Sequence, residues 1–200
     1  MKNFRSVWRH EVKQADKMAC GIIETKQPPV NWRILLLPLW ISDHIRFKKS
    51  LSLTRKNLLF TKRLAFDAAK EIFGGKDRAL EFRLIEIKTK NLLDKEKKGL
   101  YTEKIRRKQF AEIDLLIDHY LALFNSNRKV YGEMVIAAYS SKKTYQSFLS
   151  KLQKSEEEVI QASITSVRRG SKKDRTRWFQ KVKSTSKKIK TAEVDMIFSA

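Results

Sequence analysis

Apolar side chains recur at intervals of three and four residues along most of this chain, which is the spacing of one face of an α-helix. The most regular stripe lies between residues 113 and 124, after a break in the pattern at Gly99. A helix with such a stripe buries it against other elements, so we expect this segment to belong to the core. The stripe consists of Ile113, Leu116, Ile117, Tyr120, Leu121 and Phe124.

The same spacing predicts helices before this stripe. Residues 1–19 form an amphipathic pattern, and a second pattern runs from Leu51 to the pair Gly74–Gly75, which is typical of a helix end. A further helix should follow Gly75. Residues 80–88 alternate almost like a strand, but the length of the segment and its Glu and Lys content favour a helix.

Helices are also predicted after the stripe. Beyond a turn at residues 125–127, the apolar positions from Met134 to Leu152 have helical spacing. Ser155 and Glu158 have the spacing of a capping box, so either a new helix begins at Ser155 or one long helix passes through it.

The most apolar segment of the chain is Ile34–Ile41, with Pro38 near its middle. Eight helical residues rise about 12 Å, whereas the hydrocarbon core of a bilayer is about 30 Å thick, so this run alone cannot cross it. Basic residues precede and follow the run, as on the cytoplasmic side of a membrane. Two interpretations stay open: a shallow, one-sided insertion bent at Pro38, or a buried segment of a helical bundle.

The composition of the chain adds one main observation, its large positive charge. The 200 residues include 44 Lys and Arg but 22 Asp and Glu, a formal net charge of +22, and 42% hydrophobic residues, enough to form a core. Such a charge favours a polyanionic partner, either nucleic acid or the anionic inner leaflet of a membrane. The single cysteine, Cys20, fits a reducing cytoplasm, and we expect it to be a buried or half-buried small residue.

The positive charge is concentrated near the end of the chain. Between residues 168 and 190 there are eleven Lys or Arg and one acid, and Trp178 and Phe179 lie among them. Cations combined with aromatic rings suit stacking on nucleic-acid bases or insertion at a lipid interface. A solvated tail without a partner is the alternative, although Val194, Met196, Ile197 and Phe198 could dock on the body or on a partner.

Motifs that carry enzymatic chemistry are missing from the sequence. The three histidines have no partner at metal-ligand spacing, and Gly74–Gly75 lacks the flanking residues of a phosphate-binding loop. Asp114 and Asp118 share a helical face, where we expect them to pair with Lys or Arg of a neighbouring helix. We therefore expect a protein that is not an enzyme and uses neither a cofactor nor a metal.

Together these observations predict an all-α protein, a helical bundle or long helical hairpins. The expected divisions are an amphipathic N-terminal helix with its linker (1–29), a proline-containing apolar segment (30–47), a helical body (48–168) and a basic C-terminal tail (169–200). The leading hypothesis is a cytoplasmic protein that binds anionic phospholipid at the inner face of the membrane. The alternative is a nucleic-acid or ribosome-associated protein that uses the tail.

Two sets of residues would carry these functions. The membrane-interface set is Trp32, Arg33, Ile34, Leu35, Leu36, Leu37, Pro38, Leu39, Trp40, Ile41, Arg46, Lys48 and Lys49. The polyanion-binding set is Arg168, Arg169, Lys172, Lys173, Arg175, Arg177, Trp178, Lys181, Lys183, Lys187, Lys188 and Lys190.

Overall fold

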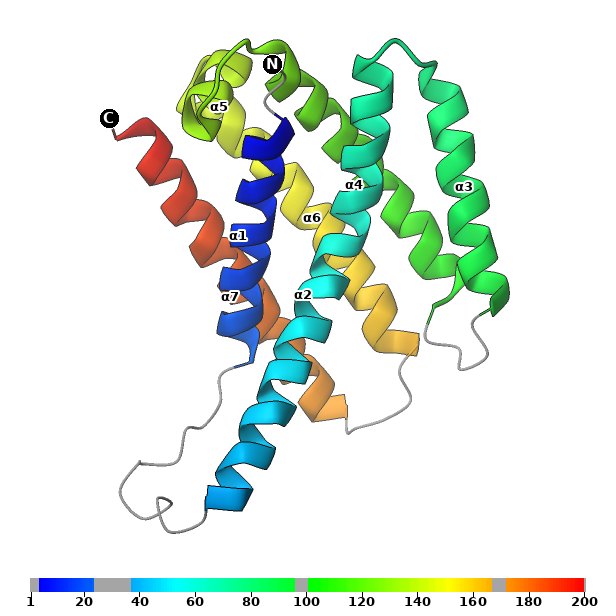
Figure 1. The fold of residues 1–200 in the computed structure, drawn as a ribbon, viewed down its shortest axis with the longest axis vertical. Coiled ribbons are helices and arrows are strands. Elements are labelled where there is room, and N and C mark those ends of the chain that lie inside the picture. Colours follow the sequence, from blue (N-terminus) through cyan, green and yellow to red (C-terminus); the bar gives the residue numbers. More distant parts are fainter. Residues whose placement is uncertain (1–3, 24–36, 96–100, 167–171, 200) are drawn as a thin grey trace.

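The regular elements of this protein are helices, as the apolar spacing predicts. The computed structural model describes residues 4–23, 37–95, 101–166 and 172–199, and the side chains of 37–50, 164, 166, 172, 174 and 175 lie outside the description. No strand occurs among the described residues, so the all-α class is confirmed. Their seven helices are α1 (Phe4–Ile22), α2 (Leu37–Phe73), α3 (Arg78–Lys95), α4 (Glu103–Asn125), α5 (Tyr131–Tyr139), α6 (Lys142–Ser166) and α7 (Lys172–Phe198) (Figure 1).

Helix α4 carries the regular stripe and supplies much of the core. Ile113, Leu116, Ile117 and Tyr120 are buried, whereas Leu121 at the edge of the stripe is half-buried and packs against the same core. The interfaces of α4 with α2 and with α6 are the most extensive in the bundle. The prediction that this segment forms part of the core is therefore confirmed.

Aromatic rings join α1 and α2 to the end of α4. The ring of Phe124 meets those of Phe4, Phe66 and Phe73 at centroid separations of 4.6, 5.7 and 5.8 Å, and the ring planes are close to perpendicular. Edge-to-face pairs of this kind contribute about 0.5–1.5 kcal/mol each beyond the burial of their area. Phe4 thus fixes the beginning of α1 to the core.

Both terminal helices are parts of the bundle and not appendages of it. Helix α1 packs against α2 and α7, with Val7 and Ala15 buried, and α7 also packs against α6. Val182, Val194 and Ile197 of α7 are buried as well. The apolar faces of α1 and α7 therefore complete the core.

The turn between α2 and α3 follows the glycine signal. Gly75 has a φ of 100°, a conformation that glycine adopts at low cost, and the N–H groups of Gly75 and Lys76 donate to the carbonyls of Ile72 and Glu71. These two hydrogen bonds form a Schellman motif, which ends α2. The Asp77 carboxylate then accepts a hydrogen bond of 2.8 Å from the N–H of Leu80 and caps α3. Residues 80–88 are helical, as predicted.

The expected helix from Met134 to Leu152 is divided into α5 and α6. Ser140 has a φ of 59°, in the left-handed region, and its N–H donates to the carbonyl of Ile136, which ends α5. The Ser141 hydroxyl accepts from the N–H of Thr144 at 3.2 Å and begins α6. Neither glycine nor proline marks this break, so the spacing alone did not reveal it. Helix α6 passes through Ser155 without interruption.

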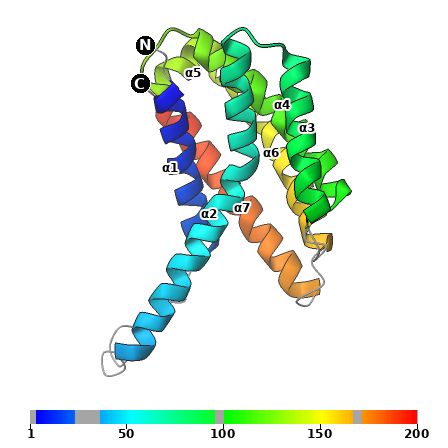
Figure 2. The same ribbon diagram turned by 45° about the vertical axis from the view of Figure 1, so that its right-hand side comes forward.

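Helix α2 is longer than the core that it helps to form. Its 37 residues correspond to about 55 Å, against about 35 Å for α4. Among residues 51–60 no side chain is buried, whereas Ala65, Phe66 and Ala69 further along the helix are in the core. The first part of α2 consequently extends beyond the other helices, as Figures 1 and 2 show.

Candidate functional site

The described part of the membrane-interface set lies at the beginning of α2. Residues 32–36 fall outside the described part of the chain, and residues 37–41 form the first turns of the helix. The side chains of this segment and of Arg46, Lys48 and Lys49 are also outside the description, so their exposure stays a prediction. Pro38 is the second residue of α2, where its missing N–H breaks no intrahelical bond. The expected bend at Pro38 is therefore replaced by the start of a helix.

A helix that crosses a membrane needs about 20 consecutive and mostly apolar residues. None of the described helices combines the necessary length with the necessary apolar character.

The polyanion-binding set lies mostly on α7. At about 100° per residue, Lys173, Arg177, Lys187 and Lys188 share the outward face of this helix, and all four are exposed. Trp178, next to Arg177, is 45% exposed. Arg168 and Arg169 lie outside the described residues, as do the side chains of Lys172 and Arg175. The structure thus brings part of the set together on one helical face.

Other cations of α7 are partly neutralised by α6. Lys190 Nζ lies 2.5 Å from Glu156 Oε2, and Lys183 Nζ lies 2.9 Å from Glu157 Oε2. The next glutamate, Glu158, pairs with Lys108 of α4 at 2.7 Å. The three consecutive acids from Glu156 to Glu158, the last of which has capping-box spacing from Ser155 in the sequence, hold α6 to α7 and α4.

Exposed cations from several helices gather at one end of the bundle. Helices α2, α4 and α7 begin at this end, and α3 and α6 finish there (Figure 1). We call this region the basal end. Among the residues whose side chains are described, two acids, Asp94 and Glu103, lie there too, and the exposed cations outnumber them. The exposed cations within two turns of these helix termini are Lys90, Lys95, Lys104, Arg107, Lys173 and Arg177.

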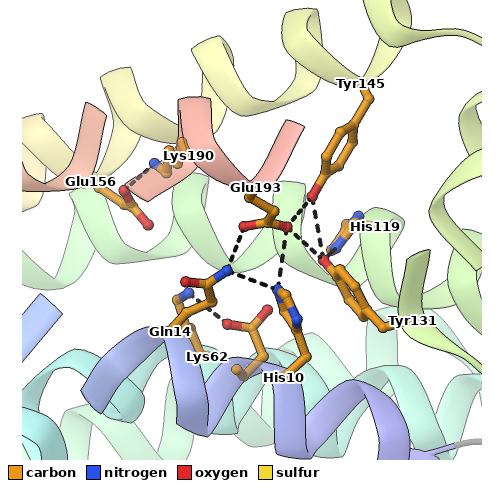
Figure 3. A network of polar contacts seen from close by, with 10 residues as sticks. His10, Gln14, Lys62, His119, Tyr131, Tyr145, Glu156, Lys190 and Glu193 are labelled. Carbon is orange, nitrogen blue, oxygen red and sulfur yellow. Dashed lines mark hydrogen bonds and ion pairs between the residues drawn. The ribbon is translucent and has the colours of Figure 1, made fainter. Parts of the chain in front are cut away.

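A network of buried polar side chains lies in the interior of the bundle (Figure 3). The Glu193 carboxylate of α7 is its centre. It accepts hydrogen bonds from Gln14 Nε2 at 2.8 Å and Tyr145 Oη at 2.6 Å, and His10 Nε2 lies 3.2 Å away. Tyr131 Oη is 3.4 Å from the same carboxylate, and the Tyr131 ring stacks on that of His10 with centroids 3.5 Å apart. The network joins α1, α5, α6 and α7.

The surroundings of Glu193 keep it charged in spite of its burial. Burial alone would raise the pKa of this carboxyl, but the hydrogen bond and charge of His10, together with the Tyr145 hydroxyl, hold the pKa below its ordinary value. Removing one of the donors would leave a charged oxygen in a dry interior without its hydrogen bond, and this would lower the stability of the fold. The interactions of Glu193 therefore stabilise one arrangement of the four helices.

A second group of charges lies beside this network. Lys62 Nζ of α2 is 2.6 Å from Glu11 Oε2 of α1, and this pair lowers the pKa of the buried Glu11 against the opposing effect of burial. Glu112 of α4 is buried as well, and burial together with the charge of Glu156 raises its pKa to about 8. Near neutral pH the Glu112 carboxyl is thus mostly protonated in the folded protein.

The histidine of α4 is buried and contacts neighbouring aromatic side chains. His119 Nδ1 lies 2.7 Å from the Tyr139 hydroxyl, and its ring stacks on Phe148 with centroids 4.5 Å apart. Burial lowers the pKa of His119 to about 4, so the ring is neutral near pH 7. His119 is therefore a neutral residue of the core.

Among the described residues, no cluster of His, Cys, Asp and Glu has the arrangement of a metal site. Asp114 and Asp118 both accept hydrogen bonds of 2.6 Å from the guanidinium of Arg78 in α3, so their predicted pairing with a cation of a neighbouring helix is confirmed.

The prediction for Cys20 is wrong, because its side chain is exposed on the surface of α1.

The sequence did not reveal the buried network. Glu11, Glu112 and Glu193 lie in segments with many charged residues, and only their helical register relative to Val7, Ile113 and Val194 could have placed them on a buried face. No protein-family model, curated protein or solved structure matches this chain.

Proposed function

We propose that this protein is a non-enzymatic binder of anionic membrane surfaces and that its basal end faces the lipid. The supporting observation is that the part of α2 which begins in the apolar segment extends beyond the core at the end where exposed cations of α3, α4 and α7 gather. An apolar segment and exposed cations towards the same end of a molecule suit peripheral lipid binding.

The expected binding free energies indicate that the apolar segment and the cations would have to act together. The apolar residues at positions 34–41 would contribute only about 3 kcal/mol by insertion, at about 0.3–0.6 kcal/mol for each Leu or Ile. Each cation near an anionic leaflet adds about 1 kcal/mol, so cations such as Lys173 and Arg177 would contribute at least as much in sum. Binding should therefore need anionic lipid and weaken with salt.

Vesicle flotation tests this proposal. The protein should float with vesicles that contain phosphatidylserine and remain at the bottom with phosphatidylcholine alone, and the floated fraction should fall between about 50 and 500 mM salt. The double variant Lys173→Gln with Arg177→Gln should lower the floated fraction. Arg128→Gln with Lys129→Gln is the matched control, because both residues are exposed in the loop between α4 and α5. Equally poor flotation with both kinds of vesicle would overturn the proposal.

One observation favours a second candidate, the binding of nucleic acid. Trp178 is exposed beside Arg177, and aromatic rings among cations can stack on bases. Filter binding against salt, with Trp178→Ala and with the four outward cations of α7 changed to Gln, tests this candidate. These point variants are needed because α7 contributes to the core, so a deletion would disturb the fold. Retention that does not depend on these residues would exclude the candidate.

A further inference from the structure

Helix α3 is apolar on two opposite faces. On the inward face, Ile85 and Thr89 are buried and Phe82 packs against the core. On the opposite face, Leu80, Leu84 and Ile87 are 51%, 39% and 51% exposed. This double face explains why residues 80–88 alternate like a strand in the sequence although they are helical: apolar residues are needed on both sides of the helix.

Cations border the outward apolar face on both sides. With about 100° per residue, Arg83 and Lys90 flank one edge of the stripe and Lys88 flanks the other. All three are exposed. Of the exposed acids of α3, Glu86 lies beyond Arg83 and Lys90, whereas Asp94, in the last turn, lies on the same edge of the stripe as these two cations. An apolar stripe between two rows of Lys and Arg is typical of helices that lie in a membrane interface, because long basic side chains can reach the headgroups while the stripe is immersed.

We propose that Leu80, Leu84 and Ile87, with the flanking Arg83, Lys88 and Lys90, form a second contact surface for anionic lipid, which we call the outer face of α3. This inference rests on the proposed function and adds to it the helix that would lie in the interface. It predicts that the protein approaches the membrane with the edge of the bundle formed by α3 as well as with the basal end.

The position of α3 in the bundle supports this assignment. Helix α3 lies at the edge of the molecule in both views, and its C-terminal end is part of the basal end (Figures 1 and 2). Its inner side is fixed: Arg78 binds Asp114 and Asp118 of α4, and Arg106 Nε donates to Thr89 Oγ1 at 3.0 Å. A firmly attached helix with an accessible apolar ridge can meet a flat surface without rearrangement of the fold.

Charge and chemistry favour lipid over other occupants of this face. Leu and Ile side chains have no aromatic ring to stack on bases, so nucleic acid would leave the stripe exposed to water. A second copy of a chain with net charge +22 would bring its own cations against Arg83, Lys88 and Lys90. An anionic lipid surface offers both an apolar medium for the stripe and negative groups for the cations.

A fluorescent probe at one position tests the proposal directly. The chain has a single cysteine, so Cys20→Ser with Leu84→Cys allows an environment-sensitive dye to be attached to the outer face of α3 alone. With phosphatidylserine vesicles we expect the emission to increase and shift to the blue. The matched control is Cys20→Ser with Val130→Cys, because Val130 is 58% exposed before α5 and should show no change.

Three results are decisive. Protein that floats with the vesicles while the dye at position 84 is unchanged would overturn this inference and leave the proposed function standing. Failure of the unmodified protein to float would overturn the proposed function, and the inference would fall with it. A blue shift at position 84 but not at position 130 would support both.

A set of serine substitutions provides an independent measurement. Leu80→Ser, Leu84→Ser and Ile87→Ser together should lower the vesicle partition coefficient roughly tenfold, from the transfer free energies of three aliphatic side chains. The control is the same number of substitutions at exposed apolar residues elsewhere, namely Val130→Ser, Ile136→Ser and Met196→Ser. Equal partitioning of the two variants would contradict the proposal. A dimer of the unmodified protein that becomes a monomer only in the first variant would assign the face to self-association and also overturn it.

Discussion

At the scale of single residues, the interior of this protein is notable for the different ways in which it accommodates buried carboxyl groups. Glu11 is paired with Lys62, and Glu193 accepts hydrogen bonds from Gln14 and Tyr145 and contacts His10. Glu112 is the exception, because burial and the nearby charge of Glu156 raise its pKa to about 8. Glu11 and Glu193 keep their charge through these contacts, whereas Glu112 mostly avoids it by holding a proton.

This difference leads to a prediction for Glu112→Gln. The unfolded chain releases the Glu112 proton near the ordinary pKa of 4.5, whereas the folded protein holds it until about pH 8. Within this range the folded state binds more protons, so a rise in pH costs stability. The variant does not titrate. We expect its stability relative to the parent to increase from pH 5 to pH 8 by an amount of the order of a few kcal/mol and then to level off, as measured by urea unfolding.

Glu158→Gln serves as the control. Glu158 is exposed and pairs with Lys108, whose hydrogen bond and charge lower the pKa of Glu158 below its ordinary value. Its contribution to stability is present above the ordinary pKa and is lost as the pH falls, so the difference between this variant and the parent should stay constant above pH 5. A pH-independent difference for Glu112→Gln as well would show that Glu112 is charged in the folded protein.

At the scale of helices, the main finding is that the basic C-terminal segment is a structural helix. Helix α7 turns Val182, Val194 and Ile197 to the core and Lys173 and Arg177 to the solvent. The sequence indicated the charge of this segment and the possible docking of Val194 and Ile197, but the high density of Lys and Arg obscured the helical spacing of the apolar residues. Whatever this segment binds, it therefore presents its cations from a fixed scaffold.

The contact between α1 and α7 provides a prediction at this scale. A Cβ atom at Gly21 would lie 2.6 Å from Thr185 Cγ2, whereas a Cβ at Gly132 would meet only Ile197 Cγ1, at an ordinary 3.8 Å. Ala in place of Gly within a helix favours folding by up to about 1 kcal/mol. Thermal unfolding should show this gain for Gly132→Ala but a smaller gain or a loss for Gly21→Ala, because Thr185 must rotate away.

A double-mutant cycle separates the close contact from helix propensity. Changing Thr185 to Ala removes the atom that the new Cβ would meet, so Gly21→Ala should be more favourable in that background than in the parent. If Gly21→Ala is equally favourable in both backgrounds, α1 and α7 do not approach each other as closely at Gly21 as the structure indicates.

At the scale of the whole molecule, net charge is the dominant property. A charge of +22 on 200 residues disfavours the compact state through self-repulsion, and ion pairs such as Lys183–Glu157 and Arg78–Asp114 do not reduce this excess, because their acids are already counted in it. Exposed ion pairs of this kind contribute about 0–1 kcal/mol each, which is too little to cancel the repulsion. The same excess charge provides the attraction to a polyanion.

Salt should therefore stabilise the protein. Between about 50 and 500 mM sodium chloride, screening weakens the repulsion over the whole surface, and we expect the midpoint of thermal unfolding to rise by a few degrees. A variant with Lys173, Arg177, Lys187 and Lys188 changed to Gln should show a smaller rise, because all four are exposed cations. A midpoint that falls with salt would mean that ion pairs outweigh the repulsion.

The sequence by itself determined the all-α class, the core stripe of α4, the turn at Gly74–Gly75 and the pairing of Asp114 and Asp118 with a cation. These features depend on neighbours within a few turns of the chain, or on charge balance, and both are visible in a linear pattern.

Tertiary structure alone decided the rest. The break at Ser140, the incorporation of α7 into the core, the buried network around Glu193 and the accessible outer face of α3 depend on which helices pack together. Local spacing places a residue on a face of its helix, but only the packing of distant segments determines whether that face is covered. For this reason Leu84 and Glu193 are found where hydropathy alone would not place them: an apolar side chain at the surface and a carboxylate inside.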